Sequence, residues 1–330
     1  MHTQLDFLAI GDAVVDDFIR LKDAEVHCDV NKEHCTICMR FGDKVPFESS
    51  TIVYGVGNAG NAAVAATRLG LNTAFITNIG KDTNGDRIVE HYKKEGMDTT
   101  YVKQHEGVPT NYHYVLWYGD ERTILVHQHT YPFTFPQNLP IPKTLYLSSL
   151  VDETGERHDA IADWLEAHRD IFFAFQPGVF EIKMGTRLAR LYKRADIFFA
   201  NKEEYQRILE SPEKSEELLL KKMKERGVKI PILTDGRNGA YALHEGTVFH
   251  LDMFPDPAPP IQRTGAGDAF SSTTTAFLTM GLPLKDAMER GLVNAAYVVQ
   301  QVGAQKGLLA RKALEEHLAS AAEQYEPYRI

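Results

Sequence analysis

The stretch RTGAGDAF, residues 263–270, decides the fold because it combines a glycine turn with the start of a helix. Gly265 and Gly267 flank Ala266, so neighbouring backbone N–H groups can point the same way without obstruction by side chains. The small and apolar residues that follow predict a helix with this turn at its N-terminus. Helix N-termini carry unpaired N–H groups and partial positive charge, so the turn is expected to hold an anion. Asp268 would lie beside that anion, where its carboxylate can take a proton from a hydroxyl group.

A plain glycine turn with Asp268 as a helix cap is the alternative interpretation of a bare GxGD sequence. The surrounding residues favour the anion site. The sequence TGAGDAF resembles the C-terminal signature of the PfkB (ribokinase-like) carbohydrate and nucleoside kinases. That resemblance implies that Asp268 is the catalytic base and that the backbone of Gly265, Ala266 and Gly267 forms the anion hole. It also implies ATP as the phosphoryl donor, together with Mg²⁺.

Size and composition limit the classes of protein to consider. A chain of 330 residues, 43% of them hydrophobic and 25% charged, suits one large α/β domain or two smaller ones. The net charge of -9 argues against nucleic acid or an anionic membrane as the main partner. No apolar run reaches the roughly 18 residues of a transmembrane helix, and the first residues do not have the pattern of a signal peptide. These features predict a cytoplasmic protein.

The three cysteines, Cys28, Cys35 and Cys38, fall in one segment over residues 20–50 that we expect to be irregular. An odd number of cysteines in a chain of this length favours reduced thiols in a reducing compartment. Cys35 and Cys38 have the CxxC spacing that binds zinc or acts in redox chemistry. One such pair with a further cysteine does not make a tetrahedral set of settled spacing. We therefore expect free thiols and no zinc.

An apolar run over residues 5–10 predicts a buried strand that leads into a loop with Asp12 and Asp16. Ligands of α/β proteins bind at the carboxyl ends of such strands, although a solvated acidic loop would have the same sequence. The resemblance implies that Asp16 binds substrate hydroxyls. Asp12 is a second candidate for the same role.

The sequence GVGNAGNAAVAATRLG, residues 55–70, predicts a turn followed by an alanine-rich helix. It resembles the N-terminal signature of the same family, in which a pair of glycines is followed by an asparagine. The match implies that Gly57 and Asn61 contact the substrate. Val56 stands in place of the first glycine of the pair, a departure from the family pattern.

Alternating residues over 112–126 predict a hairpin with its turn near Asp120 and Arg122. The resemblance implies that Arg122 faces the active site and meets a phosphate or a carboxylate. An arginine in an exposed turn is the alternative. Together, residues 13–54 and 105–135 are expected to form a small β-sheet lid.

The remaining family motifs follow predicted strands in the second half of the chain. By the resemblance, Glu204 orders Mg²⁺ through water, for which one carboxylate is sufficient; an acidic first turn of a helix is the alternative. Gln262 occupies the position of an aspartate in the family's monovalent-cation site, so we do not expect cation activation through the same ligands. The residues that the resemblance assigns to the nucleotide are Asn201, Thr234, Gly236, Gly239 and Asn294.

The sequence thus predicts one ribokinase-like domain over residues 1–330, a three-layer α/β/α core with a mostly parallel sheet and a small β lid. The expected activity is ATP-dependent phosphorylation of a hydroxymethyl group on a small sugar, as in fructokinases or ribokinases. A nucleoside kinase of the same fold and a non-catalytic sugar or nucleotide sensor remain open as alternatives. Neither nucleic acid nor a membrane is an expected partner, and a homodimer would form through the lid.

Overall fold

The computed structural model describes residues 4–28, 35–119, 121–152, 154–321, 325 and 328–329. Its main sheet has the strand order β16-β15-β14-β13-β12-β11-β10-β1-β6-β7. Neighbours from β13 to β7 pair in parallel, and β14, β15 and β16 add antiparallel pairs at one edge. The strands are β1 (Phe7–Ile10), β6 (Thr73–Gly80), β7 (Val102–His105), β10 (Thr144–Ser148), β11 (Phe172–Gln176), β12 (Ile197–Asn201), β13 (Ile230–Thr234), β14 (Ala240–His244), β15 (Thr247–Leu251) and β16 (Tyr328–Arg329).

Two hydrophobic cores lie on opposite faces of this sheet because successive side chains of a strand point to opposite sides. In β1, Phe7 and Ala9 belong to one core, and Leu8 and Ile10 belong to the other. Parallel strands covered on both faces are apolar throughout, as the fully buried β1 shows. The arrangement confirms the predicted three-layer α/β/α architecture.

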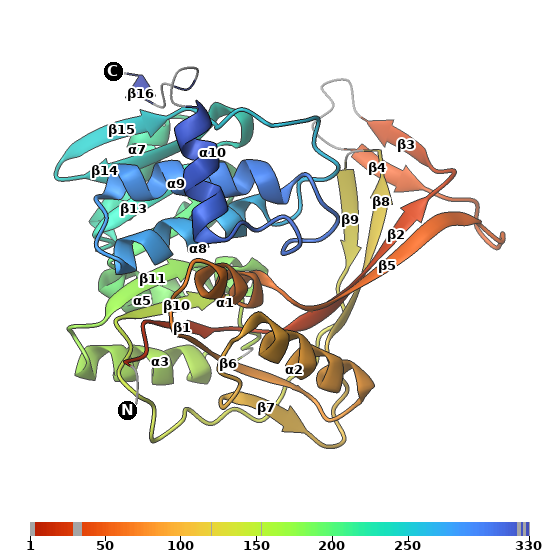
Figure 1. Ribbon diagram of the computed structural model, residues 1–330, viewed down its shortest axis with the longest axis horizontal. Helices are drawn as coiled ribbons and strands as arrows, with labels where there is room; N and C mark the ends of the chain where they lie inside the picture. Colours follow the sequence, from red (N-terminus) through yellow and green to blue (C-terminus); the bar gives the residue numbers. More distant parts are fainter. Residues whose placement is uncertain are drawn as a thin grey trace.

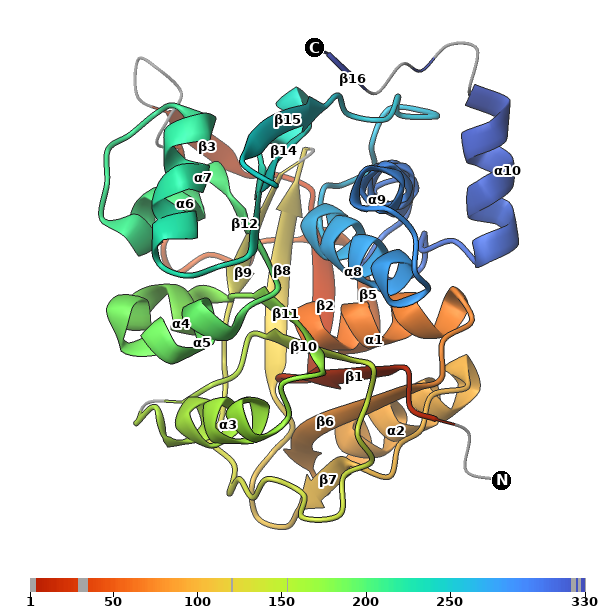
Figure 2. The same cartoon turned by 90° about the vertical axis from the view of Figure 1, so that its left-hand side faces the viewer.

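The helices divide between the two faces (Figure 2). Among the described residues, none of them combines the length and the apolar character needed to span a bilayer. One face carries α1 (Asn58–Arg68), α2 (Thr83–Glu95), α8 (Ala266–Thr279), α9 (Leu284–Val298) and α10 (Arg311–Ala321). The other carries α3 (Glu156–Ala167), α4 (Val179–Met184), α5 (Ala189–Arg194), α6 (Lys202–Leu209) and α7 (Glu216–Glu225).

A second sheet projects from the core, as Figure 1 shows. It has the order β5-β2-β8-β9, and we call it the lid sheet. Its strands are β2 (Val14–Leu21), β5 (Phe47–Val56), β8 (Tyr112–Tyr118) and β9 (Glu121–Leu125). At its far end a two-stranded ribbon is formed by β3 (Glu25–Cys28) and β4 (Cys35–Cys38).

The lid sheet corrects three expectations. Asp16 lies within β2 and not in a loop, and Arg122 lies within β9 and not in the hairpin turn. Asp120 falls outside the described residues. The described part of residues 20–50 is not irregular throughout, because it includes the end of β2, the paired strands β3 and β4, and the start of β5. The lid boundaries 13–54 and 105–135 stay a prediction.

The expectation of free thiols is also wrong. Cys28 and Cys35 are directly opposite each other in the β3–β4 ribbon and form a disulfide, and Cys38 is free and exposed. Antiparallel pairing brings the two residues together even though they are separated in the chain, which the CxxC spacing of Cys35 and Cys38 does not reveal. Within the described residues, His, Cys, Asp and Glu side chains form no group of three or more that could hold a metal ion.

Candidate active site

A cavity of about 650 Å³ lies where the lid sheet meets residues at the carboxyl ends of the central strands. We call it the main cavity. Open α/β sheets bind ligands at this edge because loops and helix N-termini meet there. The structure gathers most of the residues singled out in the sequence around it: Asp16, Gly57, Asn61, Arg122, Asn201, Glu204, Thr234, Gly265, Gly267 and Asp268 all line the main cavity.

Asp268, in the first turn of α8, is held by three side-chain amides. Asn61 donates from Nδ2 to Oδ2 at 2.7 Å, and Asn58 and Gln176 each donate to Oδ1 at 3.0 Å. Burial raises the pKa of Asp268, while the amide hydrogen bonds and the charge of Arg122 oppose that rise. The result is an oriented carboxylate with a raised pKa beside a cavity, which suits a general base.

The turn before Asp268 has the geometry of an anion site. Gly265 caps α8 in the left-handed region at φ 83°, and a Cβ there would come within 2.5 Å of the Ala304 side chain. The first N–H to be satisfied by the helix is that of Ala269, which donates to Gly265 at 2.8 Å. The N–H groups of the preceding residues have no partner within the helix. Gly267 is open, because an added Cβ would meet no heavy atom within 4 Å.

Gly57 brings the start of α1 close to β1. Its φ of 105° lies in a region that favours glycine. An added Cβ would also lie only 2.7 Å from the carbonyl oxygen of Asp12, so the position accommodates glycine alone. Asn61 then follows on the first turn of α1, where it reaches Asp268. The close approach therefore links the N-terminal glycine segment to the catalytic candidate.

Asp12 itself does not line the main cavity. Its Oδ2 accepts the N–H of Val151 at 2.7 Å, and burial raises its pKa to about 7. The two neighbouring aspartates differ because Asp16 lies in β2 and faces the cavity, whereas Asp12 packs between β1 and the segment after β10. The structure thus gives Asp12 no access to a ligand in the main cavity.

A second cavity of about 520 Å³ adjoins the first. Thr234, Gly236 and Gly239 line it, as does Ala266 from the glycine turn. Asn294 does not. On α9 the side chains of Leu292 and Ala295 face the cavity, whereas Asn294 is fully buried between helices. Its Nδ2 donates to Thr273 at 2.7 Å and its Oδ1 accepts the N–H of Leu309 at 2.9 Å. One step along a helix turns a side chain by about 100°, which separates these neighbours.

Asn201 and Glu204 have a structural role as well as a place at the cavity. Asn201 caps α6 by accepting the N–H of Glu204 at 2.9 Å, and Glu204 accepts the N–H of Asn201 at 2.8 Å. This reciprocal pair is a capping box. Burial raises the pKa of Glu204. A single carboxylate at the cavity edge fits Mg²⁺, which keeps most of its water ligands.

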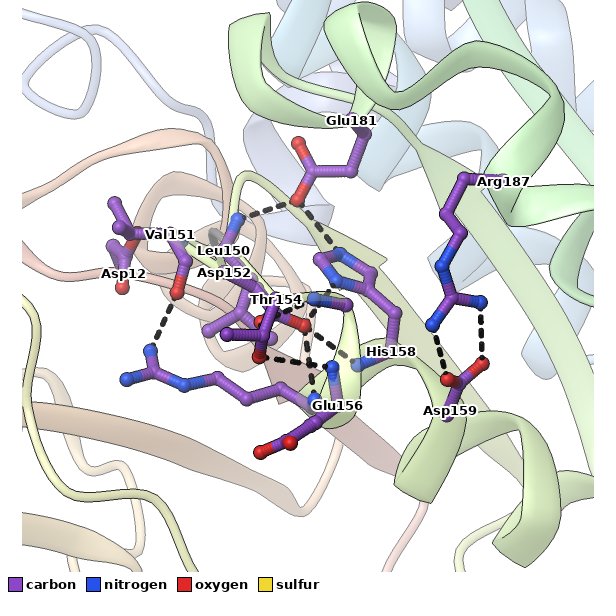
Figure 3. A network of polar contacts seen from close by, with 12 residues as sticks. Asp12, Leu150, Val151, Asp152, Thr154, Glu156, His158, Asp159, Glu181 and Arg187 are labelled. Carbon is purple, nitrogen blue, oxygen red and sulfur yellow. Dashed lines mark hydrogen bonds and ion pairs between the residues drawn. The ribbon is translucent and has the colours of Figure 1, made fainter.

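One wall of the main cavity is supported by a buried network of charges (Figure 3). His158 lies between two carboxylates, with Nδ1 at 2.9 Å from Asp152 and Nε2 at 3.1 Å from Glu181. Burial opposes the charge of His158, but the two carboxylates outweigh it and raise its pKa to about 9. Glu181 also accepts the N–H groups of Leu150 and Gly178 at 2.7 and 2.9 Å. The network therefore fixes α4, which contributes Val179, Phe180 and Lys183 to the cavity.

Sequence reasoning missed several polar residues of the main cavity, among them Asn58, His113, Gln128, Gln176 and Lys183. Asn58 and Gln176 hold Asp268, and His113 and Gln128 line the lid side. Gln176 had a usable signal, because it is a polar residue at the carboxyl end of a buried strand. Asn58 lies in the glycine segment over residues 55–70. His113 and Gln128 carry no pattern that distinguishes them from other residues of a half-exposed sheet.

Comparison with solved structures identifies the class of fold. A ribokinase from Arabidopsis thaliana, solved with ribose and ATP, superposes with a TM-score of 0.80 at 18% identity and covers 96% of this chain and 99% of its own. A nucleoside kinase from Methanocaldococcus jannaschii gives a TM-score of 0.75 at 17% identity, with 96% and 98% covered. The protein therefore has the ribokinase-like fold.

The sequence identifies the family. The model of the pfkB family carbohydrate kinases matches residues 24–311, and the chain belongs to this family of kinases. An ATP-dependent 6-phosphofructokinase of Thermoanaerobacterium thermosaccharolyticum is 25% identical over 326 residues, covering 91% of this chain and 89% of that protein. A 5-dehydro-2-deoxygluconokinase of Clostridium beijerinckii is 23% identical over 300 residues, covering 84% and 88%.

Proposed function

We propose that the protein transfers the γ-phosphoryl group of ATP to the hydroxymethyl group of a small sugar. The observation that carries this proposal is the position of Asp268, which is oriented by three amides beside the open first turn of α8 and faces the main cavity. The main cavity would take the sugar and the second cavity the nucleotide, so that the two meet at Gly267, which lines both.

In the proposed reaction, Asp268 accepts the proton of the acceptor hydroxyl as its oxygen forms a bond to the γ-phosphorus. The bond from that phosphorus to the β-phosphate oxygen breaks, and ADP leaves. The N–H groups of the glycine turn stabilise the negative charge of the transferring phosphoryl group, and Arg122 adds a positive charge from the lid. Closure of the lid excludes water, which limits hydrolysis of ATP.

Glu204 and Asn201 would hold magnesium at the edge of the cavity, largely through water. Bound magnesium supplies charge neutralisation for the nucleotide phosphates. The role of the protein residues is to place the phosphates against the glycine turn. Thr234, Gly236 and Gly239 form the other wall of the proposed nucleotide site.

A sugar is favoured over a nucleoside by the lid residues that line the main cavity. The apolar ones among the described residues are Val14, Ile124 and Val126, which are aliphatic, whereas a nucleobase is commonly held between aromatic rings. Asp16, from the same face of the lid sheet, supplies an acceptor for hydroxyl groups. A nucleoside acceptor remains the second candidate because a nucleoside kinase has the same fold.

A homodimer through the lid belongs to the same proposal. Ile52, Tyr114 and Leu125 are 46%, 47% and 50% exposed and lie on lid strands. Exposed apolar side chains on a small sheet are typical of an interface. Sedimentation analysis of the wild-type protein and of Tyr114→Glu tests this part: we expect a dimer that the charged variant dissociates.

The activity is tested by measuring ADP release with a panel of sugars and nucleosides, for the wild type and for Asp268→Asn. Asparagine keeps the size of the side chain but cannot accept the proton. We expect turnover with at least one sugar and a loss in kcat of about 10²-fold or more in the variant, with an unchanged melting temperature. Near-normal turnover in Asp268→Asn would refute the assignment of the base. If no sugar or nucleoside of the panel gives ADP release, the non-catalytic sensor is favoured.

A further inference from the structure

The disulfide of the β3–β4 ribbon lies in an exposed part of the lid. Cys28 and Cys35 face each other across the ribbon and are joined through their sulfur atoms. The side chains of both strands are exposed except that of Ile37, which is partly buried. A two-stranded ribbon by itself is marginally stable in water. A disulfide reduces the conformational entropy of the unfolded chain, so this bond favours the ordered ribbon.

The two faces of the ribbon differ in character. Successive side chains of a strand point to opposite sides, so the disulfide shares its face with Val26 and Ile37, which pair across the ribbon. The opposite face carries the free thiol of Cys38, whose sulfur lies 3.9 Å from Oγ1 of Thr36. The disulfide therefore lies on the apolar face, and the free thiol lies on the polar one.

The apolar face of the ribbon borders a cleft that extends to Arg122. This cleft has a volume of about 360 Å³ and lies between the ribbon and the lid sheet, and we call it the ribbon cleft. Val26, Cys35 and Ile37 line it from the ribbon, and Arg122 lines it from β9. Figure 1 shows the ribbon beside the ends of β8 and β9. Because Arg122 also lines the main and second cavities, it connects the ribbon to the proposed active site.

The position of the Arg122 side chain depends on its packing. Its Nε is buried and has no hydrogen-bond partner within the described part of the chain. Its strand, β9, is the edge strand of the lid sheet and pairs with β8. The guanidinium is close enough to Asp268 for its charge to oppose the rise in pKa that burial causes there. A change in the packing of the ribbon is therefore expected to move this charge relative to Asp268.

The disulfide is open to chemical reduction. Exposed disulfides are reduced more readily than buried structural ones, and disulfides of proteins in a reducing compartment are usually transient or redox-sensing. A thiolate of a dithiol reductant attacks one sulfur of the Cys28–Cys35 bond, forms a mixed disulfide and releases the other cysteine as a thiolate. The second thiol of the reductant then displaces the remaining cysteine. The protein gains two electrons and two protons, which give two thiols, and the reductant becomes a disulfide.

We propose that Cys28 and Cys35 form a reversible thiol–disulfide modification site, and that reduction by a dithiol releases the ribbon and slows phosphoryl transfer through Arg122. In the oxidised form the ribbon supports one side of the ribbon cleft and keeps the guanidinium near Asp268. In the reduced form the ribbon loses the covalent bond between its strands, and Arg122 loses an ordered neighbour. The effect on phosphoryl transfer rests on the proposed function, whereas the modification of the two cysteines does not.

The first test measures the thiol state of the full-length protein in buffers with graded ratios of reduced to oxidised dithiothreitol. Maleimide labelling and mass spectrometry count the thiols, with the exposed Cys38 as the internal reference. We expect two further thiols to appear together in the native protein and to disappear on reoxidation. Trypsin should cut the reduced protein after Lys22 or Arg40 about 10-fold faster or more, because cleavage follows the population of the released ribbon.

Two results of this first test would overturn the modification site. One is a disulfide that does not form in the oxidised buffer, and the other is a disulfide that resists the dithiol until the protein is denatured. A rate of tryptic cleavage that is the same in both thiol states would show that the bond does not hold the ribbon, and would overturn the proposed release.

The second test measures ADP release in both thiol states with the acceptor that is turned over. We expect reduction to lower kcat/KM about 3- to 10-fold and reoxidation to restore it, because a displaced charge stabilises the transition state less well. The double variant Cys28→Ser/Cys35→Ser should show the reduced value in both buffers. Cys38→Ser is the matched control, since its thiol lies on the opposite face of the ribbon, and it should respond as the wild type does.

Arg122→Gln tests the route from the ribbon to the active site. This variant should be less active in both thiol states and should show no difference between them, because the two changes act through the same group. A full response to reduction in Arg122→Gln would overturn the route through Arg122. Melting curves identify any variant that fails to fold, and the wild type in the two buffers then carries the comparison.

The outcomes separate this inference from the proposed function. Turnover of a sugar with equal kinetic constants in the two thiol states would overturn the redox control and leave the kinase intact. Absence of ADP release with every compound of the panel would refute the proposed function and, with it, the control of phosphoryl transfer. Labelling and tryptic cleavage would then still decide whether Cys28 and Cys35 form a reversible site, because neither measurement needs kinase activity.

Discussion

Asn61 donates a hydrogen bond to Asp268 at 2.7 Å although 207 residues separate them in the chain. The bond joins the N-terminal glycine segment to the glycine turn of α8, so the two signature sequences form one site. It also orients the carboxylate and opposes the rise in pKa that burial causes. The same Asn61 accepts from Gln305 at 3.0 Å, which fixes its amide in the donating direction.

Removal of an amide donor should change the pH dependence of the reaction. In Asn58→Ala, the carboxylate of Asp268 loses one of three hydrogen bonds that favour its charged form, so its pKa rises further. Because the base must be ionised, the acidic limb of kcat/KM should move upward by about one pH unit. Asn61→Ala should give the same shift with a lower melting temperature, since its contact with Gln305 is lost as well. An unmoved acidic limb in both variants would contradict the role of the amides.

The two glycines of the turn should respond differently to alanine. Gly265→Ala meets Ala304 at 2.5 Å and must adopt a positive φ, so the variant should be destabilised by more than about 1 kcal/mol. Gly267→Ala meets nothing and gains helix propensity, so its melting temperature should stay the same or rise. Its methyl group would nevertheless occupy the space before the first-turn N–H groups.

We therefore expect Gly267→Ala to lower kcat/KM for ATP about 10-fold or more while it folds normally. Thermal melting and steady-state kinetics on both variants check this pair. Full activity in Gly267→Ala would show that phosphate does not rest on this turn.

Asp12→Asn distinguishes a structural aspartate from a substrate ligand. The folded-state pKa of Asp12 is raised to about 7, so the wild type loses stability as pH rises from its unfolded value of about 4 through 7. An amide avoids this cost and can still accept the N–H of Val151. The variant should therefore exceed the wild type in stability by an amount that grows over this range, up to about 4 kcal/mol. Denaturant unfolding at pH 5 and pH 8 measures the difference, and a large rise in KM for the acceptor would restore Asp12 as a ligand.

The charge on His158 should make the buried network sensitive to alkaline pH. Its folded-state pKa is raised to about 9 from an ordinary value near 6.5, so its stabilising effect is complete below pH 6.5 and is lost as pH rises through 9. His158→Gln leaves the carboxylates of Asp152 and Glu181 without a cation, which should cost about 3–5 kcal/mol at pH 6. The difference from the wild type should shrink as pH rises from 6.5 to 9 and stay small above that. A constant difference from pH 6 to pH 10 would mean that His158 is neutral in the folded protein.

The sequence was informative where local pattern and chemistry agree. The apolar runs predicted the central strands, and the glycine turn predicted the start of α8, since both depend on neighbours in the chain. Contacts between segments that are distant in the chain could not be predicted in the same way. Gln176 reaches Asp268 across 92 positions, and no local pattern specifies that pair.

The sequence also did not predict features that depend on tertiary packing or on strand pairing. The local pattern does not separate Asp12 from Asp16, although the resemblance put Asp16 first. The path of β2 places Asp16 in the lining of the main cavity and leaves Asp12 outside it. Asn294 was misplaced because the rotation of α9 relative to the sheet depends on tertiary packing. The disulfide between Cys28 and Cys35 depends on the pairing of β3 with β4, which the spacing of the cysteines does not encode.

The main and second cavities have a common wall, formed by Arg122, Asn201, Thr234, Arg263, Gly267 and Phe270. A ligand bound in one cavity changes the electrostatic environment and the conformational freedom of these wall residues, which also contact a ligand in the other cavity. Such an influence is thermodynamically mutual, so each ligand must alter the affinity of the other by the same factor. The apparent affinity of the protein for either ligand would thus depend on the concentration of the other, and an affinity measured for one is defined only when that concentration is stated.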